Sequence, residues 1–275
     1  MKEVKKLQPE TLIALFKELL TYESEVHYSG ILPVHENQSM LLKNIKFSTQ
    51  PQKAFFVETP VAEITKPKVY INNNKKSLQS NMYILSNGAV ADEKDKALLK
   101  AFNEYFGGGM SSLVFQEIRE LRSLGYSTYA VYRNPILKEN KGFLIGYLGT
   151  QSDKTVEGVS ALVELVENMP QKPERLEVIK RSLLQGVNTE NVPFRSLTWQ
   201  VSQWRFQGYT EDPRKFQHQI YKDLTFDDIV FIYQKFISEN PIAVTISGSS
   251  KKMNTKDLLP FGEIVGVKAN EIIKK

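Results

Sequence analysis

A helix, a strand, a glycine and a second helix follow one another at both ends of the chain, and this repeat restricts the fold more than any other feature. The N-terminal copy is expected as a helix at residues 9–20, a strand at 25–28, Gly30 and a helix at 37–43. The C-terminal copy is expected as a helix at residues 225–236, a strand at 242–246, Gly248 and a helix at 254–259. Leu7 aligns with Leu224, 217 residues later, and Gly30 aligns with Gly248, 218 residues later.

Two interpretations of this repeat stay open. Any two amphipathic helices followed by strands look alike, so the similarity can be a coincidence. Alternatively, residues 1–50 are the tail of a domain that has lost everything upstream, 51–66 are a linker, and 67–275 are one complete homologous domain. The Pro- and Lys-rich stretch 59–68 marks the expected boundary.

The order of elements between the two copies predicts the fold class. Strands are expected at residues 68–72, 78–85, 126–133 and 142–151. Helices are expected at residues 92–106, 112–121, 155–167, 173–186, 194–206 and 212–223. Strands first, helices second and a strand last are typical of an α+β fold, here an antiparallel or mixed sheet packed against a helical layer, and not of alternating βαβ units. With 41% apolar residues the chain has ample material for a core.

Several classes of catalytic site are excluded by residue content. The chain has no cysteine, and therefore no thiol nucleophile and no Cys-based zinc site. Its three histidines, His27, His35 and His218, belong to no H-E-x-x-H or H-x-x-E-H pattern, and no G-x-S-x-G serine elbow occurs. We therefore expect no metal in this chain.

Charge and hydropathy argue against nucleic-acid and membrane partners. The net charge is +5, and the basic residues are spread along the chain without a stripe of stacking aromatics. No segment approaches the ~18 apolar residues of a membrane span, and charged residues interrupt the N-terminal segment, so no signal peptide is expected. The compartment stays open, cytoplasmic or periplasmic in a bacterium.

Gly107, Gly108 and Gly109 separate two expected helices. A phosphate cradle is disfavoured because the glycines follow a helix instead of a strand. The G-K-[ST] ending of a P-loop is also absent, since the residues after Gly109 are Met110-Ser111-Ser112. The alternative is a flexible break that lets two helices pack closely. Ser111 or Ser112 is expected to cap the second helix, and Gly125 to end it.

Arg119 on that second helix has no carboxylate three or four positions away, so no carboxylate of its own helix is expected to pair with it. Tyr126 follows seven residues later. A guanidinium and a phenol close together suit a developing oxyanion or a peptide carbonyl. Judged from the residues alone, a structural salt bridge between Arg119 and another segment is the favoured alternative.

Three runs around these residues resemble the pitrilysin/insulinase family of zinc metallopeptidases. They are residues 103–112 (Asn-Glu-Tyr-Phe-Gly-Gly-Gly-Met-Ser-Ser), 115–120 (Phe-Gln-Glu-Ile-Arg-Glu) and 124–127 (Leu-Gly-Tyr-Ser). The resemblance continues over nearly the whole chain. It implies an enzyme of two related halves, each of two homologous α+β domains, that enclose a chamber.

In that family one half carries an H-x-x-E-H zinc motif and a distant glutamate, and the other contributes an Arg and a Tyr seven residues apart. The resemblance thus implies that this chain is the zinc-free C-terminal half, inactive alone. Arg119 and Tyr126 would contact the peptide substrate and stabilise its transition state, and Gly107 to Gly109 would shape the chamber wall. Zinc and the general base would come from the partner half, in the same polypeptide or a separate chain.

Two other hypotheses remain. A non-catalytic scaffold or peptide-binding subunit could keep the same fold, and the presence of both Arg119 and Tyr126 argues mildly against it. A nucleic-acid-binding domain rests only on the basic net charge. An H-x-x-E-H motif in a preceding segment or neighbouring gene would favour the peptidase.

Overall fold

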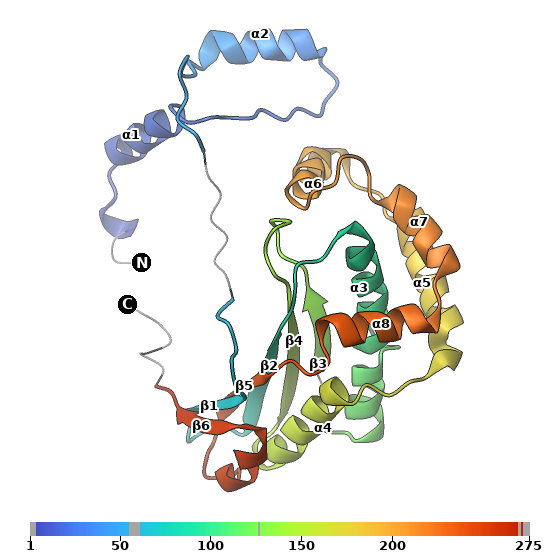
Figure 1. The fold of residues 1–275 in the computed structure, drawn as a ribbon. Coiled ribbons are helices and arrows are strands. Elements are labelled where there is room, and N and C mark those ends of the chain that lie inside the picture. Colours follow the sequence, from blue (N-terminus) through green and yellow to red (C-terminus); the bar gives the residue numbers. More distant parts are fainter. Residues whose placement is uncertain (1–3, 55–60, 126, 269–270, 272–275) are drawn as a thin grey trace. The chain divides into compact units, whose positions relative to one another are not determined.

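The computed structural model describes residues 4–54, 61–125, 127–268 and 271 (Figure 1). The chain divides into two parts, Met1–Thr59 with Asn191–Gln203, and Pro60–Glu190 with Trp204–Lys275. Helix α6 (Phe194–Phe206) contributes residues to both. Apart from α6, the strands and helices expected between the two repeat copies lie in the second, larger part.

The larger part is built on one six-stranded sheet with the order β3-β4-β2-β5-β1-β6. Its strands are β1 (Lys68–Asn73), β2 (Gln79–Asn87), β3 (Ser127–Arg133), β4 (Phe143–Gln151), β5 (Ile242–Gly248) and β6 (Glu263–Gly266). Strand β5, from the C-terminal end of the chain, lies between β1 and β2, parallel to the first and antiparallel to the second. The sheet is therefore mixed. Strand β5 of the C-terminal repeat unit connects β1 and β6 to the other three strands.

Helices cover one face of this sheet. Alternate residues of β2 are buried, among them Met82 and Ile84, as expected when one face packs on a core and the other does not. Helices α3 (Glu93–Phe106), α4 (Thr155–Glu167) and α8 (Phe226–Phe236) lie on the covered face (Figure 1). The other helical segments of the larger part are η2 (Phe115–Leu121), η3 (Ser152–Lys154), η4 (Pro173–Arg175), α5 (Leu176–Thr189), α7 (Arg214–Asp223) and η5 (Thr255–Phe261). The α+β prediction is confirmed.

Local signals in the sequence set the ends and faces of the two central helices. Both begin with a reciprocal capping box, Asp92 with Asp95 in α3 and Thr225 with Asp228 in α8. Each helix turns an apolar stripe toward the core, and the stripes are buried: Leu98, Ala101, Phe102 and Tyr105 in α3, and Ile229, Ile232, Tyr233 and Phe236 in α8.

An ion pair joins these two helices. Lys235 Nζ of α8 donates to both carboxylate oxygens of Asp95, each at 2.8 Å, and the Asp95 side chain is only 8% exposed. Lys235→Met keeps the aliphatic packing and leaves the carboxylate unpaired, so we expect the free energy of unfolding to fall by about 2 kcal/mol. Urea unfolding measures this, with Lys100→Met on the exposed side of α3 as control. Equal stability of the two variants would contradict a stabilising pair.

The smaller part contains η1 (Val4–Lys6), α1 (Pro9–Leu19) and α2 (Val34–Asn44). The two predicted helices are confirmed, but the predicted strand at 25–28 is wrong. In the described residues of this part the backbone makes one isolated bridge, between Tyr22 and Gln52. A strand needs a neighbour for its hydrogen bonds. The equivalent strand β5 has neighbours on both sides, whereas residues 25–28 have none.

The apolar stripe of α1 is exposed. Leu12, Leu15, Phe16 and Leu19 each keep more than half of their accessible surface. The equivalent stripe of α8 is buried against α3 and the sheet. The same pattern thus has a core to pack on in one copy, and in the other it is solvent-exposed.

Candidate functional site

The segment that carries Arg119 is a π-helix, η2 (Phe115–Leu121). The sequence predicted a helix here, with Ser111 or Ser112 as its cap. Ser112 is the cap, since its Oγ accepts a hydrogen bond from the Phe115 backbone nitrogen at 3.4 Å. The wider π turn was not predicted, and turns of this kind are frequent at functional sites. Fully buried Val114 and Ile118 anchor the helix to the core.

Helix η2 ends at Leu121, the expected last residue, but Gly125 does not terminate it. The residue with a left-handed backbone after the helix is Ser123, whose φ is +50°. Gly125 instead lies against β4, where a β-carbon would collide with the carbonyl oxygen of Gly149. The glycine is needed for the close approach of two backbones.

The Arg119 guanidinium lies over the ring of Phe115, 4.7 Å from its centroid. Its Nε is 3.5 Å from a carboxylate oxygen of Glu120, and the Arg119 side chain is 34% exposed. The expectation that no carboxylate of the same helix pairs with Arg119 is therefore wrong, because two long neighbouring side chains can bend toward each other. Such partly exposed pairs are worth little, typically below ~1 kcal/mol. The stacking on Phe115 holds the guanidinium at the surface of η2.

Tyr126, the predicted companion of Arg119, lies outside the described residues. The donor pair therefore stays a prediction. The backbone on either side is fixed by Gly125 against β4 and by β3, which begins at Ser127.

The three glycines differ in their surroundings. At Gly107 a β-carbon would lie 2.5 Å from the backbone nitrogen of Ala130 in β3 and closer still to its carbonyl oxygen. The glycine thus lets the end of α3 touch a strand, and not a second helix as the flexible-break interpretation supposed. At Gly108 a β-carbon would lie 2.8 Å from the Asn103 carbonyl oxygen, whereas Gly109 faces open space.

Hydrogen bonds join the glycine loop to η2. Ser112 N donates to the carbonyl oxygen of Gly109 at 3.0 Å, and the Gln116 side-chain amide donates to that of Met110 at 2.9 Å. Gln116 precedes Arg119 by three residues on η2. Together, α3, the glycine loop at residues 107–109, η2 and β3 form one framework that positions the Arg119 guanidinium. Exposed Met110 and Leu121 lie on the same framework.

A third segment, which the sequence analysis missed, braces this framework. Lys172 Nζ pairs with Glu117 of η2 at 2.7 Å, and Arg175 Nη1 donates to the Ser111 carbonyl oxygen at 2.9 Å. The Tyr105 hydroxyl donates to the Pro170 carbonyl oxygen at 2.5 Å. Burial raises the pKa of the Tyr105 phenol, so it remains a donor at neutral pH. These partners lie far apart in the sequence, and no short-range spacing indicates them.

The residues described do not suit zinc. His27 pairs with Glu25 at 3.0 Å, and His35 lies beside Glu36. In residues 4–54, 61–125, 127–268 and 271, no three His, Asp or Glu side chains gather as metal ligands would.

The framework of α3, glycine loop, η2 and β3 lies within a stretch that a family model recognises. The model, described as the peptidase M16 inactive domain, matches residues 33–183, more than half of the chain. The chain belongs to the peptidase M16 family. This confirms the resemblance to pitrilysin-type enzymes, and it assigns the chain to their zinc-free C-terminal half.

Solved structures share the fold of this M16 chain. The peptidase M16 inactive domain from Pseudomonas fluorescens matches with a TM-score of 0.62 and 18% identity, over 79% of this chain and 51% of that one. A Helicobacter pylori protease matches with a TM-score of 0.61 and 13% identity, over 80% and 53%. The Escherichia coli periplasmic protease PqqL matches with a TM-score of 0.59 and 12% identity, over 80% and 24%. At such identities the likeness establishes the fold.

This M16 chain spans about half the length of the first two of these structures. No curated protein matches it. Among the helices in the described part of the chain, none combines the length and the hydropathy needed to cross a bilayer.

Proposed function

We propose that this chain forms the substrate-side part of an M16 metalloendopeptidase, in which Arg119 binds a peptide carbonyl opposite the zinc-bearing half. The position of Arg119 carries the proposal: its guanidinium is stacked on Phe115 at an exposed turn of a π-helix, beside the glycine loop. The carboxylate of the half-exposed Glu120 lies 3.5 Å from its Nε.

The role proposed for Arg119 is to orient the substrate and to stabilise charge. A guanidinium presents several N–H donors in a rigid fork, and it keeps its charge at any physiological pH. Donors held in place before the reaction stabilise negative charge that develops on a carbonyl oxygen, by about 3 kcal/mol for one donor. Tyr126 would supply a second donor, and Gly108 and Gly109 would leave room for the peptide backbone.

The catalytic metal and the general base would belong to the partner half. The matched region covers 51% of the P. fluorescens structure and 53% of the H. pylori structure, so about half of each lies outside the match and leaves room for such a half. The E. coli and H. pylori neighbours are proteases by their names, which supports peptide bonds as the substrate class.

We also propose that residues 1–50 complete a homologous domain upstream. The repeat offset and the exposed stripe of α1 support this, since the equivalent stripe of α8 packs on a helix and a sheet. The rest of that homologous domain, and not the zinc-bearing half, would then bring an equivalent helix and sheet to α1.

A substitution on α1 tests this partner surface. Phe16→Asp puts a charge at the middle of the exposed stripe, so we expect affinity for a polypeptide that supplies the rest of this homologous domain to fall at least 100-fold while the chain stays folded. Calorimetry on the mixture of the two polypeptides measures it. Glu10→Lys on the same helix is the control, and unchanged affinity of the Phe16 variant would remove α1 from the interface.

Photo-cross-linking tests the peptide contact itself. A benzoylphenylalanine at Leu121, two residues from Arg119 and 70% exposed, should cross-link to a non-cleavable peptide in the assembled protein. The same probe at Glu139, in the loop at the opposite end of the β3–β4 pair, should not. Cross-links at both sites or at neither would contradict a peptide site at η2.

The alternative is a scaffold or peptide-binding subunit without catalysis. The description of the matching family as an inactive domain is compatible with both functions. Cross-linking at Leu121 does not distinguish the two functions. Hydrolysis does, because an assembled scaffold would cut no peptide bond.

A further inference from the structure

Helices α3, α4 and α8 cover one face of the larger sheet, and the middle of the opposite, open face carries no charged side chain (Figure 1). Three rows of residues cross this open face in register, from β3 through β4 and β2 to β5. The rows are Ser127-Gly149-Asn81-Ser247, Tyr129-Tyr147-Tyr83-Thr245 and Val131-Ile145-Leu85-Ala243. Charged residues make up 24% of the chain, so their absence from these rows sets the open face apart from an ordinary solvated surface.

Three tyrosines form most of the middle row. The ring of Tyr147 lies 5.0 Å from that of Tyr83 and 5.7 Å from that of Tyr129, measured between centroids. Tyr83 is 39% exposed, and the other two rings are partly exposed. Such a continuous aromatic surface can contact an apolar side chain with its rings, while its phenols keep their hydrogen bonds.

An asparagine at one end of the open face already binds a backbone segment. Asn87, the last residue of β2, donates from Nδ2 to the Ile64 carbonyl oxygen at 2.7 Å. Its Oδ1 accepts from the Ile64 backbone nitrogen at 3.0 Å. The segment at residues 61–66 belongs to no helix or strand, and the side-chain amide supplies the donor and the acceptor that a neighbouring strand would supply. The open face thus has one place where a polypeptide backbone lies against it.

Asn81 lies on the same strand and the same face, six residues earlier. Its Oδ1 accepts from the Tyr147 hydroxyl at 2.7 Å, and within the described part of the chain its Nδ2 has no hydrogen-bond partner. A β-carbon at Gly149 would lie 2.9 Å from the Tyr147 hydroxyl and 3.7 Å from Asn81 Oδ1, so the glycine leaves the space that this pair occupies. Asn81 Nδ2 is therefore an exposed donor that is held in place beside the tyrosine row.

The strand register places Asn81 near the segment that follows Arg119. Asn81 pairs with Gly149 of β4, and Gly149 pairs with Ser127, the first residue of β3. Adjacent strands are about 4.8 Å apart, so Asn81 lies about 10 Å from the start of β3. An extended peptide covers this distance with about three residues.

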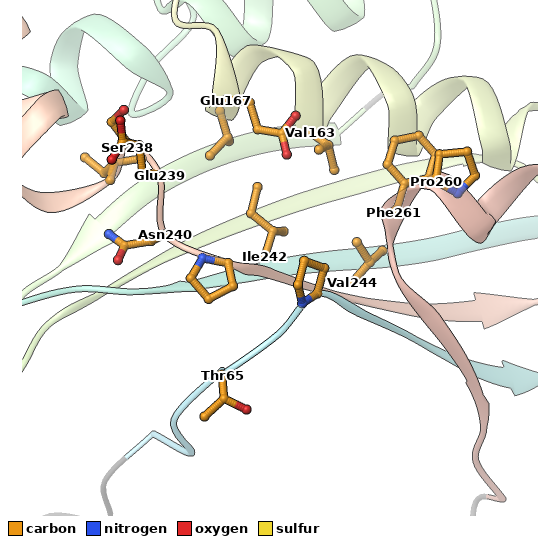
Figure 2. A pocket seen from close by; sticks show the side chains of 14 residues that line it. Thr65, Val163, Glu167, Ser238, Glu239, Asn240, Ile242, Val244, Pro260 and Phe261 are labelled. Carbon is orange, nitrogen blue, oxygen red and sulfur yellow. The ribbon is translucent and has the colours of Figure 1, made fainter.

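A pocket elsewhere in the larger part has a different chemistry. It lies between the last turn of α4 and the beginning of β5, and Figure 2 shows Glu167 on the helix and Glu239 beside it. These two residues bring carboxylates to the helix-covered side of the sheet. Asn81 is opposite Ser247, near the other end of β5, so the open face is a separate surface.

We propose that the open face continues the peptide site of Arg119, with Asn81 donating to a carbonyl oxygen of the substrate backbone. The row of Tyr83, Tyr129 and Tyr147 would contact an aromatic or aliphatic side chain about three residues from the carbonyl that Arg119 binds. A charged side chain there would lose hydration without gaining a counter-charge. The substrate class is thus peptides with an apolar residue near the scissile bond, and this inference rests on the proposed function of the chain.

Binding of two matched peptides to the full chain tests the surface without the zinc-bearing half. The peptides are acetyl-Ala-Ala-Phe-Ala-Ala-amide and its counterpart with glutamate in place of phenylalanine. We expect the phenylalanine peptide to bind about tenfold more tightly and to shift the NMR signals of residues 81–83, 129 and 147–149. Equal binding of the two peptides, binding of neither, or shifts confined to other residues would overturn the proposal.

Asn81→Asp is the matching variant, because it keeps the acceptor for Tyr147 and replaces the free donor by a negatively charged oxygen. It should weaken binding of the phenylalanine peptide about tenfold. Asn74→Asp, in the exposed turn between β1 and β2, adds the same charge away from the open face and should leave binding unchanged. An equal loss in both variants would show a general effect of charge and would count against Asn81 as a contact.

Two further measurements separate this proposal from its alternatives. Self-association of the chain that Asn81→Asp abolishes, with no effect on peptide binding, would assign the open face to a second copy. In the assembled enzyme, Tyr83→Ser should lower the ratio of kcat/KM for phenylalanine over glutamate substrates about fivefold. Hydrolysis without any such preference would overturn the role of the open face and leave the peptidase proposal standing. Peptide binding at Asn81 without hydrolysis would do the reverse.

Discussion

Arg119→Ala is expected to lower kcat/KM for peptide hydrolysis by the assembled enzyme about 100-fold. The loss corresponds to one preorganised donor at a developing oxyanion, worth about 3 kcal/mol. The chain should stay folded, because the Arg119 side chain is 34% exposed and its contact with Glu120 is 3.5 Å long. Steady-state kinetics on a complex of confirmed stoichiometry measures the effect, and thermal unfolding of the isolated chain confirms the fold.

Two further variants make this prediction specific. Arg122→Ala lies on the next turn, where the side chain pairs with Glu164 at 3.7 Å, and should change kcat/KM less than threefold. Arg119→Lys keeps the charge but loses the fork, so it should recover only part of the lost activity. Near-normal turnover of Arg119→Ala, or an equal loss in Arg122→Ala, would assign Arg119 a structural role.

Gly107→Ala is expected to lower the free energy of unfolding by about 3 kcal/mol. Its β-carbon would stand 2.5 Å from the Ala130 backbone nitrogen, so the end of α3 must move away from β3. Moving the neighbouring strand instead would disturb the hydrogen bonds that join β3 to β4 along its length. Urea unfolding of the Gly107→Ala variant and of the unchanged chain measures the effect.

Gly109→Ala is the matched control, since a β-carbon there meets no atom within 4 Å. Its stability should change by less than about 0.5 kcal/mol. If Gly109 lines the substrate chamber, the same variant should instead change KM in the assembled enzyme. Equal destabilisation by the two substitutions would show that the contact with Ala130 is not what requires glycine at position 107.

The parts of the fold that the sequence predicted correctly depend on local signals. Helix α8 could be placed from Thr225 and Asp228 at its start and from its apolar stripe, and the structure shows both the capping box and the buried stripe. The expected strand at 25–28 has the same local pattern as β5 but no neighbouring strand. A strand depends on its neighbours, which a local pattern does not describe.

The candidate site shows the same division. The helical nature of the Arg119 segment and its Ser112 cap follow from local residue types. The π turn does not follow from them, because the same residue types also suit an ordinary α turn. Gly107 was recognised as a break, but its contact with Ala130 joins residues that only the sheet brings together.

Hydrolysis of a quenched fluorescent peptide by the zinc-bearing half, with and without this chain, is the most direct measurement. If the chain is the substrate-side part of the enzyme, activity appears only when both are present, and it saturates at an equimolar ratio. The zinc-bearing half alone should remain inactive with its metal in place. No activity from a well-formed, zinc-loaded complex would contradict the peptidase proposal and favour the scaffold.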